Sequence, residues 1–210
     1  MIAGLAAVSG GALAQEGGGA DDAPRDITFR AFRKDNDIGT HAIRFRPGGA
    51  LLHVEVAIDL KVTFGFLTLY RYTHRAAETW RDGRLTRLET TTNDNGDAFE
   101  VRAEAEGDSL RVDGQDGVVM LPAETLPTSY WRPDTPRRSL LLDTQRGIPL
   151  EVTAEPAGRE RVPWRGGPAE SRRYAVRGDL NLDLWYTADD ELAKVAFAAR
   201  GAEISYVPMV

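Results

Sequence analysis

The sequence predicts an all-β fold, an antiparallel meander of roughly a dozen strands curled into a barrel or half-barrel, with few or no helices. Two observations lead to this class. Apolar residues recur at every second position over long stretches, and Gly, Asp and Asn turn signals separate these stretches at regular spacing. Because each expected strand has one apolar face, a sheet this wide has to curl or close to bury that face.

The strongest alternation covers residues 52–64, where seven apolar residues share one parity and polar residues such as His53 and Glu55 take the other. The seven are Leu52, Val54, Val56, Ile58, Leu60, Val62 and Phe64. Successive side chains of a strand point to opposite faces. This segment is therefore expected to be a strand with one buried face and one solvent-exposed face.

The other strands are expected on both sides of this segment. Residues 38–46 precede it, with His41, Ile43 and Phe45 on the apolar face. The pair Asp82-Gly83 favours a tight hairpin, because a type I′ turn requires positive φ at both central residues. Further strands are expected at residues 66–80, 84–92, 99–105, 180–186, 192–200 and 203–207, with turns at 93–96 and 107–108. A turn of helix is expected within residues 121–129, and an exposed loop at 163–168.

The N-terminal residues predict an exported protein. Residues 2–14 are apolar and small and close with Ala12-Leu13-Ala14, which is typical of a secretory signal peptide and its cleavage site. The stretch is too short to cross a bilayer as a helix, which takes about 20 apolar residues. No Lys or Arg precedes it, so either the α-amino group supplies the charge or the start lies upstream. We expect a signal peptide over residues 1–14, a flexible leader over 15–26 and a single all-β domain over 27–210. The domain is expected to be periplasmic or secreted. The alternative to a signal peptide is a disordered Ala/Gly tail.

Composition excludes several classes of function. The 210 residues contain no Cys, which rules out disulfides, thiolate metal sites and cysteine nucleophiles. A net charge of −6 argues against nucleic-acid binding, because phosphates attract clustered Lys and Arg. Aromatic residues make up only 8 %, too few for the two aromatic girdles of an outer-membrane barrel, so a membrane-spanning protein is not expected.

Candidate catalytic groups are sparse. His41, His74 and Glu78 share the apolar parity of their strands and could converge in an interior cleft, where two His and one carboxylate can bind Zn or Fe. However, residues four apart on a strand lie about 13 Å apart, so His74 and Glu78 cannot reach one metal without a bulge. No nucleophile elbow and no phosphate-binding Gly loop is present. The sequence favours a protein that is not an enzyme and has no metal or cofactor; a hydrolase or metal site remains the weaker alternative.

Four spaced strings in the chain resemble those of an exported bacterial family described as domain of unknown function 6134. The strings are Ile38-Gly39-x-His41, Tyr70-x-Tyr72-x-His74-x-x-x-Glu78-x-Trp80-x-x-Gly83-x-Leu85, Pro127-Thr128-Ser129-x-Trp131 and Leu142-Asp143-Thr144-Gln145-x-Gly147. The resemblance covers nearly the whole mature chain. It implies an exported β-rich domain and carries no established activity. Such aromatic and polar residues can line a site or fix the packing of a barrel.

A broad antiparallel meander tends to enclose an apolar cleft. We therefore hypothesise that the protein binds a lipid-like or other apolar molecule in the cell envelope. The candidate ligand-binding residues are His41, Tyr70, Tyr72, His74, Glu78, Trp80, Ser129, Trp131, Asp143 and Gln145. The alternative is a filled sandwich of two sheets that serves as a non-catalytic structural or interaction module.

Overall fold

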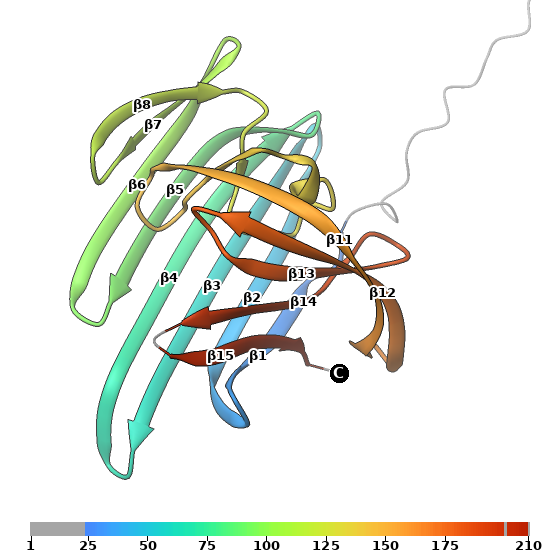
Figure 1. Ribbon diagram of the computed structural model, residues 1–210. Helices are drawn as coiled ribbons and strands as arrows, with labels where there is room; N and C mark the ends of the chain where they lie inside the picture. The colour runs from blue at the N-terminus through green and yellow to red at the C-terminus, as the bar shows by residue number, and fades with distance from the viewer. Residues whose placement is uncertain (1–23, 200, 210) are drawn as a thin grey trace, which may run out of the picture.

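A computed structural model describes residues 24–199 and 201–209 (Figure 1). The first wall of the molecule contains β1 (Ile27–Arg33), β2 (Asn36–Gly48), β3 (Leu51–Phe64), β4 (Leu67–Arg81), β5 (Arg84–Asp94), β6 (Asp97–Glu106), β7 (Ser109–Gly114) and β8 (Gly117–Pro122). A connecting region holds β9 (Leu126–Pro127), the 3-10 turn η2 (Thr135–Arg137) and β10 (Leu140–Leu142). The second wall contains β11 (Pro149–Trp164), β12 (Gly167–Gly178), β13 (Leu182–Thr187), β14 (Leu192–Ala199) and β15 (Ala202–Pro208). The expected signal peptide lies outside the described residues.

The fifteen strands form one sheet that curls into an open barrel. Each strand pairs with its neighbours in the chain except that β8 and β9 do not pair, and β1 also pairs with β15, so the two ends of the chain meet in the middle of the sheet. All pairings are antiparallel except that of β9 with β10. In Figure 1, β11–β15 cross in front of the wall formed by β1–β8. The sheet ends at β8 and β9 without joining them, which confirms the predicted curled meander and its half-barrel form.

The alternation of apolar residues sets which face lies inside. On β3, Val54 and Val56 are buried, whereas Glu55 and Lys61 on the other parity are exposed. Phe64 departs from the expectation, because it lies at the end of the β3–β4 hairpin and is 77 % exposed. The predicted buried face of β3 therefore ends at Val62.

Hairpin turns occur where the turn pairs predicted them. Asp82 and Gly83 have φ of 50° and 76°, and Asn95 and Gly96 have φ of 56° and 113°. These positive values are those that Asp, Asn and Gly tolerate and that most residues avoid. Turn chemistry in the sequence therefore identified both positions correctly.

One local prediction was wrong, and a second was right only in part. No helical turn forms within residues 121–129, where two prolines remove ladder donors; the chain instead passes from β8 into the short β9. The segment 163–168 is exposed as expected except at Trp164, but it is a tight hairpin and not an irregular loop, because β11 continues to Trp164 and turns directly into β12. The Trp164 side chain is buried, and its indole N–H donates to Glu191 at 3.2 Å.

Strand β13 is buried on both faces, although the alternation of residues 180–186 predicted one apolar face and one solvent-exposed face. On the outer face, the Trp185 ring is covered by the Arg173 guanidinium, 5.2 Å from its centroid, and by the Lys194 ammonium at 4.5 Å. The Trp185 indole also donates to Glu160 at 3.1 Å. Long charged side chains thus cover an apolar ring that the strand pattern placed in solvent. Within the described ranges, no helix is long and apolar enough to cross a membrane.

Candidate functional site

A cavity of about 980 Å³ lies between the two walls of the open barrel. Apolar residues of β2–β4, such as Ile38, Ile58 and Val62, line one side of it. Val195 and Phe197 of β14 line the opposite side. The cavity therefore follows from the alternation of apolar and polar residues, because the apolar faces of both walls point toward the same interior.

A row of directly opposed residues crosses the first wall of the cavity. His41 on β2 faces Ile58 on β3, Ile58 faces His74 on β4, and His74 faces Thr92 on β5. Directly opposed residues of antiparallel strands point to the same side of the sheet. The two histidines share the wall but lie two strands apart, about 10 Å from backbone to backbone. Ile58 separates them.

His41 is a buried histidine in aromatic surroundings. Its ring lies 5.5 Å from the Phe29 ring and 5.2 Å from the Tyr206 ring, measured between centroids. Neither ring nitrogen has a hydrogen-bond partner within the residues that the structure describes. Burial, with a smaller contribution from His74, lowers the pKa of His41 to about 3. The imidazole is therefore neutral at neutral pH.

His74 is held by a hydrogen bond and an aromatic contact. Its Nδ1 lies 2.8 Å from the Thr92 hydroxyl, and the Tyr72 ring stacks on it at 6.4 Å between centroids. Burial, together with the nearby Arg75 charge, lowers the pKa of His74 to about 4. His74 thus also presents a neutral ring to the cavity at neutral pH.

Polar groups gather at one part of the cavity, where two loops meet β4. The Tyr72 hydroxyl donates to Gln145 Oε1 at 3.2 Å, and burial raises the pKa of Tyr72. Asp143 accepts a hydrogen bond from the Gln145 backbone N–H at 2.8 Å. Burial also raises the pKa of Asp143, against the opposing effect of that hydrogen bond. Ser129 also lines the cavity, so this part offers hydroxyl and amide groups that can hydrogen-bond to a polar group of a ligand.

The loop over residues 143–148 lies across the gap between the sheet edges. Thr90 on β5 donates to the Thr144 carbonyl at 2.7 Å, and the Gln115 N–H donates to the Arg146 carbonyl at 2.7 Å. Gly147 permits this close approach, since a Cβ at this position would lie 2.7 Å from the Gly114 Cα. The loop thereby closes part of the barrel that strand pairing leaves open.

Glu78 belongs to a separate buried cluster outside the cavity. Its Oε2 accepts hydrogen bonds from the indole N–H groups of Trp80, at 2.8 Å, and Trp131, at 3.0 Å. Burial raises the pKa of Glu78, against the lowering effect of hydrogen bonds from Trp131, Ser129 and Trp80. Arg132 lies over both indole rings, 5.3 Å and 5.5 Å from their centroids. This cluster ties the segment after β9 to β4 and so has a structural role.

The structure brings together seven of the ten candidate residues. Those that line the cavity are His41, Tyr70, Tyr72, His74, Ser129, Asp143 and Gln145. Glu78, Trp80 and Trp131 pack in the separate cluster, so the expected convergence of Glu78 with the two histidines does not occur. Over the described residues, no group of three or more His, Cys, Asp and Glu side chains could hold a metal ion.

Sequence reasoning missed the residues of the second wall. Leu182, Val195, Phe197, Ile204 and Tyr206 also line the cavity. Their alternation along β13–β15 was visible, but nothing in a strand pattern says which other strand it will face. The signal that could have found them was the apolar parity of residues 192–207.

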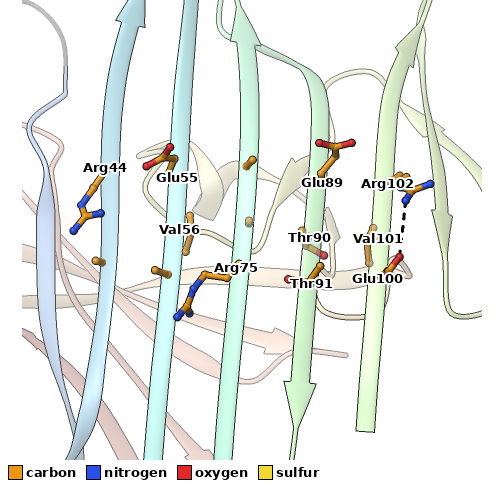
Figure 2. A pocket seen from close by; sticks show the side chains of 14 residues that line it. Arg44, Glu55, Val56, Arg75, Glu89, Thr90, Thr91, Glu100, Val101 and Arg102 are labelled. Carbon is orange, nitrogen blue, oxygen red and sulfur yellow. Dashed lines mark ion pairs between the residues drawn. The ribbon is translucent and has the colours of Figure 1, made fainter.

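A second hollow, of about 540 Å³, lies on the outer face of β2–β6. Figure 2 shows charged side chains of both signs around it, including Arg44, Glu55, Arg75 and Glu89. Arg102 and Glu100 form an ion pair at 3.9 Å there, with both side chains more than 70 % exposed. Small residues of adjacent strands create the depression, and its charges are solvated. The internal cavity is therefore the candidate site.

These observations define a β-barrel-like protein with an internal, mainly apolar cavity. The family model described as Domain of unknown function (DUF6134) matches residues 29–209, and the chain belongs to this family. The resemblance seen in the sequence is thereby confirmed.

One solved structure with the same fold is the crystal structure of a beta-barrel-like protein of domain of unknown function DUF1849 from Brucella abortus. It superimposes with a TM-score of 0.59 at 9 % sequence identity, over 89 % of this chain and 96 % of that chain. At this identity the likeness concerns the fold alone. No curated protein matches the sequence significantly.

Proposed function

We propose that this protein is exported and binds a lipid-like, mainly apolar molecule in the cell envelope. The apolar part of the ligand lies between the two walls, and its polar group hydrogen-bonds near Tyr72 and Gln145. The observation that carries the proposal is the cavity itself, whose volume of about 980 Å³ is in the range of small-molecule sites. Each methylene transferred from water into such walls contributes about 0.8 kcal/mol.

The cavity's polar groups favour binding over hydrolysis. His74 bonds to Thr92, and His41 has no hydrogen-bond partner within the described residues, so neither histidine is placed to activate a serine. Ser129 adjoins the Glu78 carboxyl instead. Neutral imidazole, phenol and amide groups suit hydrogen bonding to a ligand's polar end.

Export is supported by the sequence of residues 2–14, which is typical of a signal peptide. Cleavage after Ala14 would produce a mature chain that begins at Gln15. Intact-mass measurement of the protein purified from its native envelope tests this part of the proposal. A chain that retains residues 2–14 in the cytosolic fraction would contradict it.

The ligand site is tested by filling the cavity with a side chain. Ile58→Trp places an indole between the two histidines, on the cavity wall. We expect the affinity for a fluorescent fatty acid to fall at least tenfold, because the indole occupies ligand volume. Fluorescence titration of the purified protein measures the change.

The matched control is Ala57→Trp, on the neighbouring residue of the same strand. Ala57 lines the outer hollow, so its indole lies on the opposite face of the sheet. We expect this variant to bind like the wild type. Equal affinity of all three proteins, or no saturable uptake by the wild type, would contradict the proposed function.

A further inference from the structure

The β3–β4 hairpin extends beyond the rest of the sheet. The pairing of β3 with β2 ends at Leu60, and the strand pairing of β4 with β5 begins at Tyr72. Residues 61–71 therefore form strand pairs only with each other across the hairpin. At about 3.4 Å per residue, Phe64 lies roughly 14 Å beyond Leu60. Figure 1 shows this hairpin reaching below the other hairpins.

The tip of this hairpin is apolar and exposed. Phe64 is 77 % exposed, Phe66 104 %, Leu67 56 % and Leu69 54 %. These four are the majority of the seven large hydrophobic residues that are exposed in the part of the chain that the structure describes. Turns usually carry polar residues, and each large apolar side chain left in water forgoes about 1.5–3 kcal/mol of burial. The tip is therefore expected to have a partner.

The shape and size of the tip favour a lipid bilayer over a second copy of the chain. A stable protein interface takes about 800 Å² per partner with complementary packing, whereas this patch is the convex end of a single hairpin. A fluid bilayer needs no complementary surface, because aromatic and aliphatic side chains insert among the acyl chains and headgroups.

Two cations stand directly behind the apolar tip. Lys61 and Arg71 are cross-strand partners, both exposed, and neither forms an ion pair within the described residues. Such a pair is placed to contact anionic headgroups when the tip is inserted. Charge and apolarity thus match a bilayer that contains anionic lipid.

The tip also adjoins the cavity. Part of the cavity lining comes from Val62, Leu69 and Tyr70, which belong to the same β3–β4 hairpin as Phe64 and Phe66. We propose that residues 64–69 dock the protein onto an anionic lipid bilayer, with Lys61 and Arg71 at the headgroups, and so bring the cavity to the membrane surface. The docking goes beyond the proposed function and does not require the cavity to be occupied.

Flotation of the full mature chain with vesicles tests the docking. Vesicles of phosphatidylcholine with phosphatidylglycerol are compared with vesicles of phosphatidylcholine alone. We expect the wild type to bind the mixed vesicles, and the double variant Phe64→Ser/Phe66→Ser to bind at least tenfold less, since two inserted rings are lost. We expect Lys61→Gln/Arg71→Gln to lose about tenfold on the mixed vesicles and little on the neutral ones.

The control variant is Val118→Ser/Met120→Ser, which removes exposed apolar residues of β8 away from the hairpin. It should bind vesicles like the wild type. Thermal unfolding and fatty-acid titration of each variant check the fold and the cavity separately, so a loss of docking is distinguishable from a loss of ligand binding. Absence of vesicle binding by the wild type would overturn the docking proposal. So would a wild-type dimer in sedimentation that Phe64→Ser/Phe66→Ser converts to monomers without any effect on vesicles.

Discussion

His41 and His74 become much weaker bases when the protein folds. Each has an ordinary pKa of about 6.5 in an unfolded chain. Burial lowers these values in the folded protein to about 3 and about 4. The unfolded chain therefore binds more protons than the folded one between these limits, and the free energy of unfolding falls as the pH decreases from about 6.5.

This pH dependence should be weaker without His41. In His41→Phe, the slope of the free energy of unfolding between about pH 6 and pH 4.5 should decrease by about 1.4 kcal/mol per pH unit, which is the contribution of one histidine. Urea denaturation at several pH values measures the slope. The control is His53→Gln, on the exposed face of β3. A slope that is the same in the wild type and in His41→Phe would refute the assignment.

Gly39 shows how closely two strands of this sheet approach. Its φ is +142°, and a Cβ at this position would lie 1.9 Å from the Asp59 carbonyl oxygen. The shift in register between Ala31 and Phe32 lies opposite it, on β1. A glycine is therefore required where β2 bends against β3. This position lies where the pairing of β2 with β3 ends, next to the projecting part of the β3–β4 hairpin.

Gly39→Ala should consequently destabilise the protein far more than an ordinary turn substitution. We expect a loss of more than about 3 kcal/mol in the free energy of unfolding, because β2 and β3 have to separate to admit the methyl group. Gly49→Ala is the matched control, since Gly49 also has positive φ but nothing within 4 Å of its added Cβ. That variant should lose about 1 kcal/mol. Chemical denaturation compares them, and equal losses would refute the close approach.

The whole molecule places two curved walls around one cavity. The two histidines and the β3–β4 hairpin lie on the adjacent strands β2–β4. The pairing of β1 with β15 continues the sheet into the second wall, whose Val195 and Phe197 line the cavity opposite them. A cavity of this kind should discriminate ligands by the apolar volume they bury. Its capacity of about 980 Å³ sets the upper limit.

Ligand affinity should therefore depend on chain length. For saturated fatty acids of about 8 to 18 carbons, the affinity should rise about fourfold per added methylene and then level off when the cavity is full. Competition against a fluorescent fatty acid measures this series. In Ile58→Trp the plateau should occur at a shorter chain. An affinity independent of chain length would contradict burial of the chain between the walls.

The sequence by itself determined β2–β6 and β13–β15, most turns and the inward parity of the long strands, because these follow from neighbouring residues. It did not place β1 or β7–β12. The burial of Val54 and Val56 depends only on strand geometry, which repeats every two residues. The turn at Asp82-Gly83 depends only on the φ values that these two residues can adopt. Of the seven candidates that line the cavity, His41, Tyr70, Tyr72 and His74 lie on the strands where this parity applies. The other three, Ser129, Asp143 and Gln145, lie between strands and were indicated by the family resemblance.

Only the tertiary structure decided which inward residues meet. Parity placed His74 and Glu78 on one face, but the packing of Trp131 against Glu78 drew that carboxylate into a separate cluster. Parity likewise marked Phe64 as buried, but it extends past its neighbouring strands and is exposed. Trp185 lies on the parity opposite Leu182 and Leu184, yet it is buried, because Arg173 and Lys194 cover its ring. The physical reason is that the two-residue period of a strand determines to which face of the sheet each side chain points. Which side chains it then contacts depends on where the curled sheet ends and on which strands lie opposite.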